Sequence, residues 1–134
     1  MRIKISSFTI FLMIFFGCKR TKIDEKELIF KAYFKQAVFE KCLYYGFNGS
    51  RTFKELMKQN KGGGGEFIMY SDHIIDSIAK STNVKMVSDS IASIGKVAEG
   101  SEGKHIISTC LALYTSKMLD SIAGVEYQKY KNLR

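Results

Sequence analysis

The chain contains no proline and no tryptophan, and it has only three cysteines and two histidines in 134 residues. Proline is the residue that most often breaks helices and fixes tight turns, so its absence favours helices joined by Gly, Asn and Ser turns. Three cysteines are too few for a disulfide-dense scaffold. With 46% hydrophobic and 25% charged residues, the composition indicates one globular domain and excludes collagen-like, mucin-like and multi-span membrane proteins.

The first eighteen residues are typical of an export signal that ends in a lipid-anchor site. Two basic residues, Arg2 and Lys4, precede the mainly apolar run Ile5–Phe16. This run is too short to cross a bilayer core of about 30 Å as a helix, and it is typical of a secretory signal. Gly17 directly precedes Cys18, which resembles a lipobox, where the Cys is diacylated and becomes the first mature residue. A plain signal peptide and a buried first helix are the alternatives.

Lipidation at Cys18 would divide the chain into a signal peptide (1–17), a tether (18–27) and a helical domain (28–134). The mature protein would lie in the periplasm, held to a membrane by acyl chains instead of a transmembrane helix. Lys19 stands where Asp commonly signals inner-membrane retention, which favours the outer membrane. An oxidising compartment also permits disulfides.

The charge of the chain does not require a nucleic-acid partner. Residues 1–17 contain two basic and no acidic residues, so their removal lowers the formal charge from +8 to +6. Three of the remaining basic residues, Lys19, Arg20 and Lys22, lie beside the expected anchor, where anionic headgroups would attract them. An exported protein seldom meets nucleic acid, so no nucleic-acid partner is expected.

The spacing of apolar residues predicts an all-α protein, a compact bundle of about six helices. The expected helices span about 24–45, 52–60, 71–80, 84–98, 107–114 and 116 onward. The first is apolar on most sides, which is typical of a central helix. Ser81-Thr82-Asn83 is expected to break the chain between the third and fourth helices, and Phe67–Tyr70 is the one stretch that could form a strand.

Two of these helices carry regular apolar stripes that we expect to face the core. The stripes consist of Val84, Val87, Ile91, Ile94 and Ala98 in one helix, and of Ile107, Cys110, Leu111 and Tyr114 in the next.

No pattern of residues indicates catalysis, a metal or a cofactor. His73 and His105 belong to neither an HExxH nor a Cys-x-x-Cys pattern, so no zinc site is expected. The glycine run Gly62–Gly65 is followed by Glu66 instead of the Lys-Ser or Lys-Thr of a phosphate loop, and a tight corner between helices is expected there. The chain is therefore predicted to be no enzyme and to bind no cofactor.

The two cysteines in predicted helices, Cys42 and Cys110, are expected to form a disulfide in an exported protein. Two buried free thiols are the first alternative. A nucleophilic thiol with His73 or His105 as its base is the second.

The Gly-rich loop between the two apolar stripes is the candidate partner-binding site. Loops on a rigid scaffold carry binding functions more often than helix faces do. The residues of this loop are Glu99, Gly100, Ser101, Glu102, Gly103 and Lys104. A solvated connector is the alternative interpretation.

Three segments together resemble the amidase immunity proteins of type VI secretion systems. Phe39–Phe47 is similar to the Cys-containing end of that family's first long helix, and Gly63–Phe67 is similar to its glycine corner. Ile107–Leu119 is similar to its pattern of Cys, aromatic, Ser and Leu across the last two helices. The resemblance covers roughly residues 28–130.

The resemblance implies a non-enzymatic, all-helical periplasmic protein that inhibits a peptidoglycan amidase effector, a papain-like Cys-His hydrolase. In that family a loop before the penultimate helix fills the amidase groove, which corresponds to Lys96–Lys104 here. Family members are often dimeric, so a homodimer is a further expectation. A lipoprotein adaptor that binds a resident periplasmic protein is the alternative function.

Overall fold

The structure is a computed structural model that describes residues 24–59, 66–98 and 101–133. In order along the chain, its helices are α1 (Glu25–Gly46), α2 (Arg51–Gln59), the 3-10 helix η2 (Glu66–Ser71), α3 (Asp72–Ser93), α4 (Ile106–Tyr114) and α5 (Lys117–Asn132). The all-α prediction is confirmed over these ranges. The expected signal peptide, Cys18 and the glycine run 62–65 lie outside the described residues. No helix of the described ranges is both long and apolar enough to cross a membrane.

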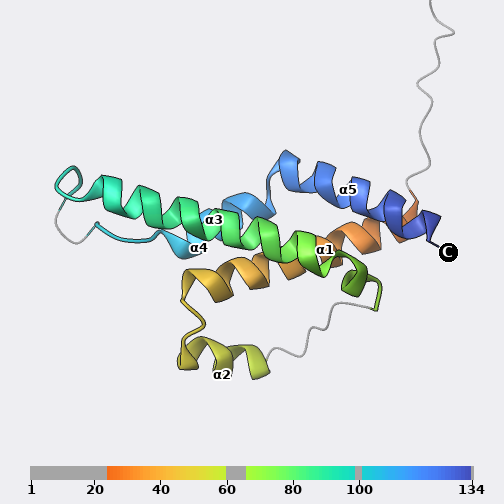
Figure 1. Cartoon of the computed structure of the whole chain (residues 1–134), viewed down its shortest axis with the longest axis horizontal. Coiled ribbons are helices and arrows are strands. Elements are labelled where there is room, and N and C mark those ends of the chain that lie inside the picture. The colour runs from red at the N-terminus through yellow and green to blue at the C-terminus, as the bar shows by residue number, and fades with distance from the viewer. Residues whose placement is uncertain (1–23, 60–65, 99–100, 134) are drawn as a thin grey trace, which may run out of the picture.

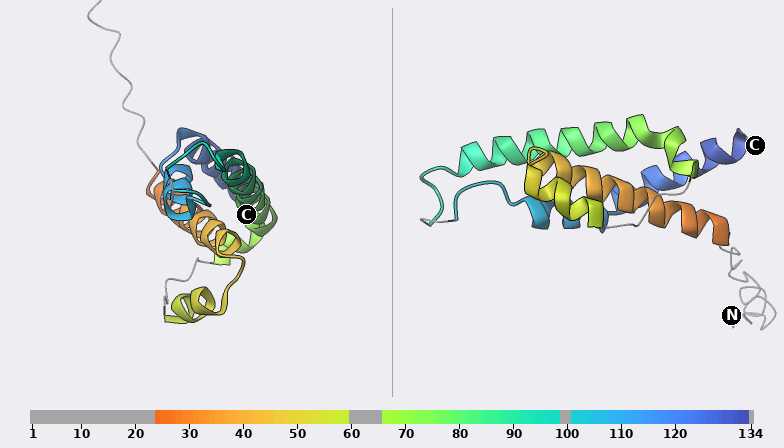
Figure 2. Two further views of the ribbon diagram at one scale, coloured as in Figure 1. Left: turned by 90° about the vertical axis from the view of Figure 1, so that its left-hand side faces the viewer. Right: turned by 90° about the horizontal axis from the view of Figure 1, so that it is seen from below.

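Helix α1 lies at the centre of the bundle, as its mostly apolar surface predicted. It contacts α3, α4, α5 and η2. Figures 1 and 2 show α1 and α3 side by side along the long axis and running in the same direction, whereas α4 and α5 run back along them. Helix α2 lies to one side of this arrangement.

The core follows one side of α1, where Phe30, Phe34, Val38 and Cys42 recur every four residues and are buried. This spacing places all four on one face of the helix. The other buried apolar residues that pack against them are Ile68, Ile75, Ala79, Met86, Cys110, Leu113, Leu119, Ala123 and Tyr127. Complete burial of each large apolar side chain stabilises the fold by about 1.5–3 kcal/mol.

The ends of the helices are fixed by local hydrogen bonds. The side chain of Asp24 accepts a hydrogen bond from the backbone N–H of Lys26, so α1 begins at Glu25, inside the segment expected to be a tether. Ser116 caps α5 in the same way by accepting from the N–H of Leu119. Beyond α1 the chain turns through Asn48, whose φ of 53° is tolerated by Asn.

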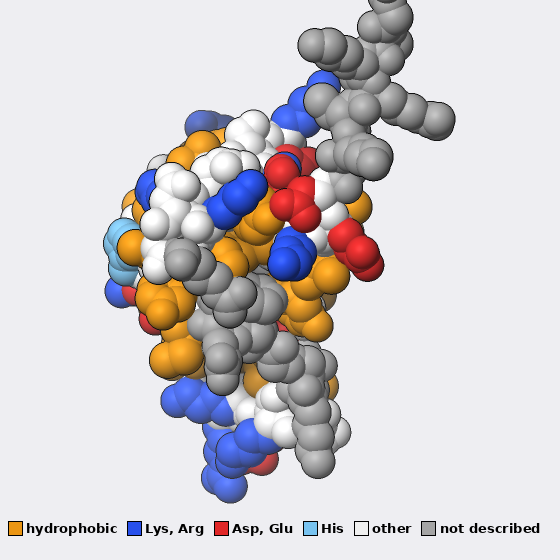
Figure 3. All heavy atoms as spheres, turned by 90° about the vertical axis from the view of Figure 1, so that its right-hand side faces the viewer, with side chains coloured by type: hydrophobic (Ala, Val, Ile, Leu, Met, Phe, Trp, Pro, Cys, Tyr) orange, Lys and Arg blue, Asp and Glu red, His pale blue; other side chains and the backbone are white. Residues whose placement is uncertain are grey.

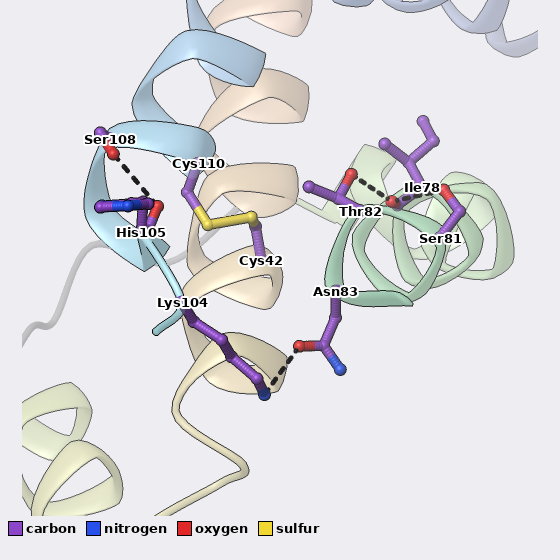
Figure 4. Close-up of a disulfide and its surroundings, with 9 residues drawn as sticks. All are labelled: Cys42, Ile78, Ser81, Thr82, Asn83, Lys104, His105, Ser108 and Cys110. Atoms are coloured by element: carbon purple, nitrogen blue, oxygen red, sulfur yellow. Dashed lines mark hydrogen bonds between the residues drawn. A yellow bond between two sulfur atoms is a disulfide. The ribbon is translucent and has the colours of Figure 1, made fainter. Parts of the chain in front are cut away.

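The expected break at residues 81–83 does not occur, and α3 is one helix of 22 residues. The hydroxyl groups of Ser81 and Thr82 both donate to the carbonyl of Ile78, at 2.9 and 2.8 Å (Figure 4). These polar side chains are thus satisfied within the helix and do not end it. The described residues consequently contain five α-helices instead of the six expected.

Two further predictions about helix faces and strands are wrong. Ile91, Ile107 and Leu111 were expected in the core but are mostly exposed, at 65%, 64% and 50%. Helix α4 is apolar on nearly every side, so spacing alone did not select the face that packs inward, which is the face of Ile106, Cys110 and Leu113. The stretch 67–70 is part of the 3-10 helix η2 and not a strand.

Candidate functional site

The loop between α3 and α4 lies at the end of the bundle opposite the start of α1 (Figure 1). Helix α1 has 22 residues and follows the long axis between the two ends. At 1.5 Å per residue, this length separates the loop from Asp24 by about 33 Å. Any anchor attached through the chain before Asp24 therefore joins the molecule far from the candidate loop.

The side chain of Lys104 links the base of the loop to the turn after α1 and to α3 by hydrogen bonds. Its Nζ donates to Oδ1 of Asn48, in the turn after α1, at 3.3 Å. It also donates to Oδ1 of Asn83, in the middle of α3, at 3.4 Å (Figure 4). Lys104, which the sequence placed among the partner-binding residues, has a role in positioning the loop in this structure.

The described part of the loop folds back on itself. The N–H of Gly95 donates to the carboxylate of Glu102 at 3.3 Å, and the N–H of Ser101 donates to the carbonyl of Ala98 at 2.9 Å. Gly103 has a φ of +119°, a conformation that glycine adopts without a steric penalty. Ser101 and Glu102 are exposed. Glu99 and Gly100 lie outside the described residues.

Exposed apolar side chains flank the loop on its α3 side. Ile91 and Ile94 are each 65% exposed, and Val97 is 41% exposed. Ile91 and Ile94 belong to the regular stripe that was expected to face the core, whereas Val97 does not. Exposed apolar side chains beside a polar loop are typical of protein-binding surfaces.

The disulfide between Cys42 and Cys110 joins the end of α1 to α4, close to the loop (Figure 4). The two Cα atoms lie 5.8 Å apart, and both residues are completely buried. This is the pairing expected from the sequence. In this state both sulfur atoms are bonded to each other, so neither is a thiol.

The two histidines lie on different elements. His73 lies in the first turn of α3, whereas His105 directly precedes α4 and belongs to the surroundings of the disulfide (Figure 4). Among the residues that the structure describes, no group of three His, Cys, Asp or Glu side chains is placed to hold a metal ion.

A polar cluster links α1 to α3 on the side of the bundle. The hydroxyl of Tyr45 donates to the carboxylate of Asp76, which also pairs with Lys80 at 2.6 Å and with Lys41 at 3.7 Å. The hydrogen bonds from Lys80 and Tyr45 lower the pKa of Asp76, and the same carboxylate raises the pKa of Tyr45 and of Lys80. The charges are satisfied within the cluster, which indicates a structural role.

A second pair of polar contacts lies at the end of the bundle where α1 begins. The hydroxyl of Tyr127 donates to Asp24 at 2.6 Å, and Ser71 donates to the buried Glu126 at 3.1 Å. The hydrogen bond to Asp24 raises the pKa of Tyr127 from 10.0 to about 12 and lowers the pKa of Asp24. Figure 3 views this end, where acidic, basic and hydrophobic side chains are mixed.

Comparison of the chain with known proteins gives no match: no family model, no curated protein and no solved structure corresponds to it.

Proposed function

We propose that the chain is an immunity protein: it binds and sterically inhibits a type VI secreted peptidoglycan amidase and so protects the cell wall against the toxin of sister cells. The lipid on Cys18 holds the protein in the periplasm, with the outer membrane favoured. The chain itself performs no catalysis and carries no cofactor.

The observation that carries this proposal is the position of the loop and its apolar flank. Exposed Ile91, Ile94 and Val97 lie beside the loop, at the end of the bundle remote from Asp24. Six peptide steps from Cys18 to Asp24 span at most about 22 Å. A tether of this length keeps the start of α1 near the membrane and presents the loop to the periplasm.

The proposed mechanism is occlusion of the amidase groove. The apolar flank supplies a desolvated contact that provides most of the affinity, and the polar loop enters the substrate groove. Glu99 and Glu102 resemble the acidic groups of a peptidoglycan stem peptide, and the neighbouring glycines permit close approach of the backbone. The disulfide and Lys104 hold the base of the loop, which reduces the ordering cost on binding.

Replacement of residues 99–103 by a Gly-Ser stretch of equal length tests the role of the loop. The mature chain, purified from membranes in detergent, is mixed with the amidase encoded beside its gene, and peptidoglycan cleavage is followed. We expect the replacement to abolish inhibition, while Val125→Ser, at an exposed position on α5, leaves it intact. Full inhibition by the loop variant would show that the loop is not the inhibitory element.

The second candidate function is that of an adaptor that binds a resident periplasmic protein. The same exposed flank supports it, because an apolar contact surface does not distinguish a toxin from a resident partner. An adaptor would co-purify with a partner that the same cell makes constitutively, whereas an immunity protein would bind an amidase encoded beside its own gene.

A further inference from the structure

A cavity of about 560 Å³ lies between the start of α1 and the end of α5. Its apolar lining consists of Ile29 and Phe30 of α1 and of Tyr127 and Tyr130 of α5. Phe30 and Tyr127 are buried, and the ring centroid of Phe30 lies 5.6 Å from those of both tyrosines. Ile29 is 45% exposed, so one apolar wall of the cavity is in contact with solvent. This size and these aromatic walls are typical of a site for a small molecule.

The polar part of the lining has a net positive charge. Of the described residues that line the cavity, Lys26, Lys131 and Asp24 are charged. Lys26 is the second residue of α1, and Lys131 lies in the last turn of α5. The hydrogen bond from Tyr127 lowers the pKa of Asp24, and the charges of Lys131 and Lys26 lower it further, so both ammonium groups lie near this carboxylate. Figure 3 shows hydrophobic side chains exposed beside basic ones at this end of the molecule.

The two lysines keep hydrogen-bond donors for a further anion. Each oxygen of Asp24 already accepts one hydrogen bond, Oδ1 from the N–H of Lys26 at 3.1 Å and Oδ2 from the hydroxyl of Tyr127 at 2.6 Å. Neither Lys26 nor Lys131 forms an ion pair with any residue that the structure describes. An ammonium group has three donors and no acceptor, so both lysines remain able to bind an anion.

The neighbouring acidic residues do not line the cavity. Glu27 pairs with Lys31 at 2.5 Å, and Glu126 pairs with Lys129 at 2.6 Å. Glu25 is exposed in the first turn of α1. The cavity thus combines an apolar floor with two available cations, which is complementary to an anionic amphiphile.

The chain's own lipid anchor fits this cavity less well. The acyl groups expected on Cys18 carry no charge, so they do not use the two lysines. The segment 18–23 that bears them contains three basic residues and no acidic one. The lysines of the cavity repel such a segment. A separate molecule with an anionic head satisfies both the floor and the charges.

We propose that this cavity binds an anionic phospholipid of the membrane. The phosphate lies between Lys26 and Lys131, and part of an acyl chain covers Ile29, Phe30 and Tyr130. A lipid bound here would hold the start of α1 against the membrane and direct the opposite end of the bundle, with the loop, away from it. The proposal rests on the proposed lipid anchor for access to the membrane, and it does not depend on the amidase.

Quenching of tyrosine fluorescence by brominated lipids tests this proposal. The chain contains no tryptophan, so its emission comes from tyrosines, two of which line the cavity. The mature chain is kept in micelles of an uncharged detergent, and phosphatidylglycerol with brominated acyl chains is added. The matched lipid is phosphatidylcholine with the same chains, whose choline cancels the charge of its phosphate. We expect half-maximal quenching by phosphatidylglycerol at an about tenfold lower concentration.

Two double variants and one single variant locate the site. Lys26→Gln with Lys131→Gln should abolish the preference for phosphatidylglycerol. Lys85→Gln with Lys117→Gln removes the same charge from exposed positions outside the cavity and should keep the preference. Ile29→Ser removes an apolar wall and should weaken quenching by phosphatidylglycerol about tenfold. All five positions are exposed, and circular dichroism verifies that each variant is folded.

Several results would overturn this proposal. These are equal quenching by the two lipids, a preference that survives in the variant of Lys26 and Lys131, and a preference lost in the control variant of Lys85 and Lys117. Displacement of phosphatidylglycerol by millimolar inorganic phosphate, but not by chloride of equal ionic strength, would identify a free anion as the ligand instead of a lipid. None of these results bears on inhibition of an amidase by the loop, so the two proposals fail separately.

Discussion

At the scale of single residues, hydrogen bonds between distant positions hold the start of α1 to the rest of the bundle. The hydroxyl of Tyr127, buried on α5, donates to the Asp24 carboxylate across 103 positions of sequence. This contact couples the two groups, because the carboxylate stabilises the neutral tyrosine and the hydroxyl stabilises the ionised carboxylate.

The stability of the protein should therefore depend on pH through Tyr127. Its pKa is raised from 10.0 to about 12, so its contribution is fully present below pH 10 and is lost between about pH 10 and 12. The pKa of Asp24 is lowered by the same bond, so its contribution is present above its usual pKa of 3.8 and is lost as the pH falls through the lowered value. Denaturant unfolding of the wild-type chain and of Tyr127→Phe, measured at several pH values, checks this.

In Tyr127→Phe both pH-dependent losses should become smaller, because neither group keeps its partner. Tyr33→Phe, at an exposed position of α1, is the control for general effects of alkali on tyrosine. A pH profile of Tyr127→Phe identical to that of the wild type would contradict the contact.

The disulfide should make the largest single contribution among the side-chain links. Cys42 and Cys110 are 68 positions apart, and the chain-entropy model gives about 4 kcal/mol for closing a loop of this size. We expect the double variant Cys42→Ala, Cys110→Ala to lose about 2–4 kcal/mol of unfolding free energy, measured in urea. A reductant should lower the stability of the wild type but not that of the variant. An insensitive wild type would indicate that the thiols are free.

Gly46 should tolerate no side chain, because a Cβ there would overlap the Ile106 side chain at the start of α4. We expect Gly46→Ala to cost about 1–3 kcal/mol of stability by overpacking. The second substitution Ile106→Ala should restore part of the loss, which a thermal melt would detect. A Gly46→Ala variant as stable as the wild type would show that α1 and α4 do not approach each other this closely at Gly46.

Contacts between individual residues were predictable from the sequence only where few residues of the required type are present. The pairing of Cys42 with Cys110 followed from the expected export of the chain. The contacts of Tyr127 with Asp24 and of Tyr45 with Asp76 were not predictable, because polar pairs at separations of 103 and 31 residues leave no local pattern.

At the scale of elements, periodicity predicted the existence of the helices better than their boundaries and faces. The continuous α1 was predicted correctly, since it has a long apolar pattern without breakers. The break at 81–83 was wrong because Ser81 and Thr82 bond back to Ile78 inside α3. The face of α4 was wrong because a helix that is apolar all round gives no directional signal.

The Gly-rich composition was enough to locate the candidate loop in the sequence. The hydrogen bonds that hold the base of the loop could not be predicted in the same way. Lys104 bonds to Asn48 and Asn83, which lie 56 and 21 residues away in the sequence. The exposure of Ile91 and Ile94 could not be predicted from the sequence either. A regular apolar stripe has the same spacing whether another helix of the chain or a partner protein covers it.

Removal of the Lys104 side chain should loosen the loop without unfolding the bundle. Lys104→Met loses two hydrogen bonds at a partly exposed position, so we expect a loss of at most about 1 kcal/mol. Amide hydrogen exchange should become faster in residues 101–105 and remain unchanged in α5. Lys85→Met, on the exposed surface of α3, is the control. Unchanged exchange in the loop would show that Lys104 does not hold it.

At the scale of the whole molecule, the two ends of the bundle carry different features. The end that carries Asp24 receives the chain from the expected anchor, and the opposite end carries the loop and its apolar flank. The proposed function, that of a tethered protein that binds other proteins, requires the loop and the anchor to lie at opposite ends in this way.

The most direct test of this account is a titration of peptidoglycan cleavage. A fixed amount of the amidase encoded beside the gene is mixed with increasing amounts of the mature chain, and cleavage of purified peptidoglycan is measured. The account predicts a linear fall to no activity at one chain per amidase, together with a stable complex on gel filtration. Full cleavage at excess chain, with no complex formed, would contradict it.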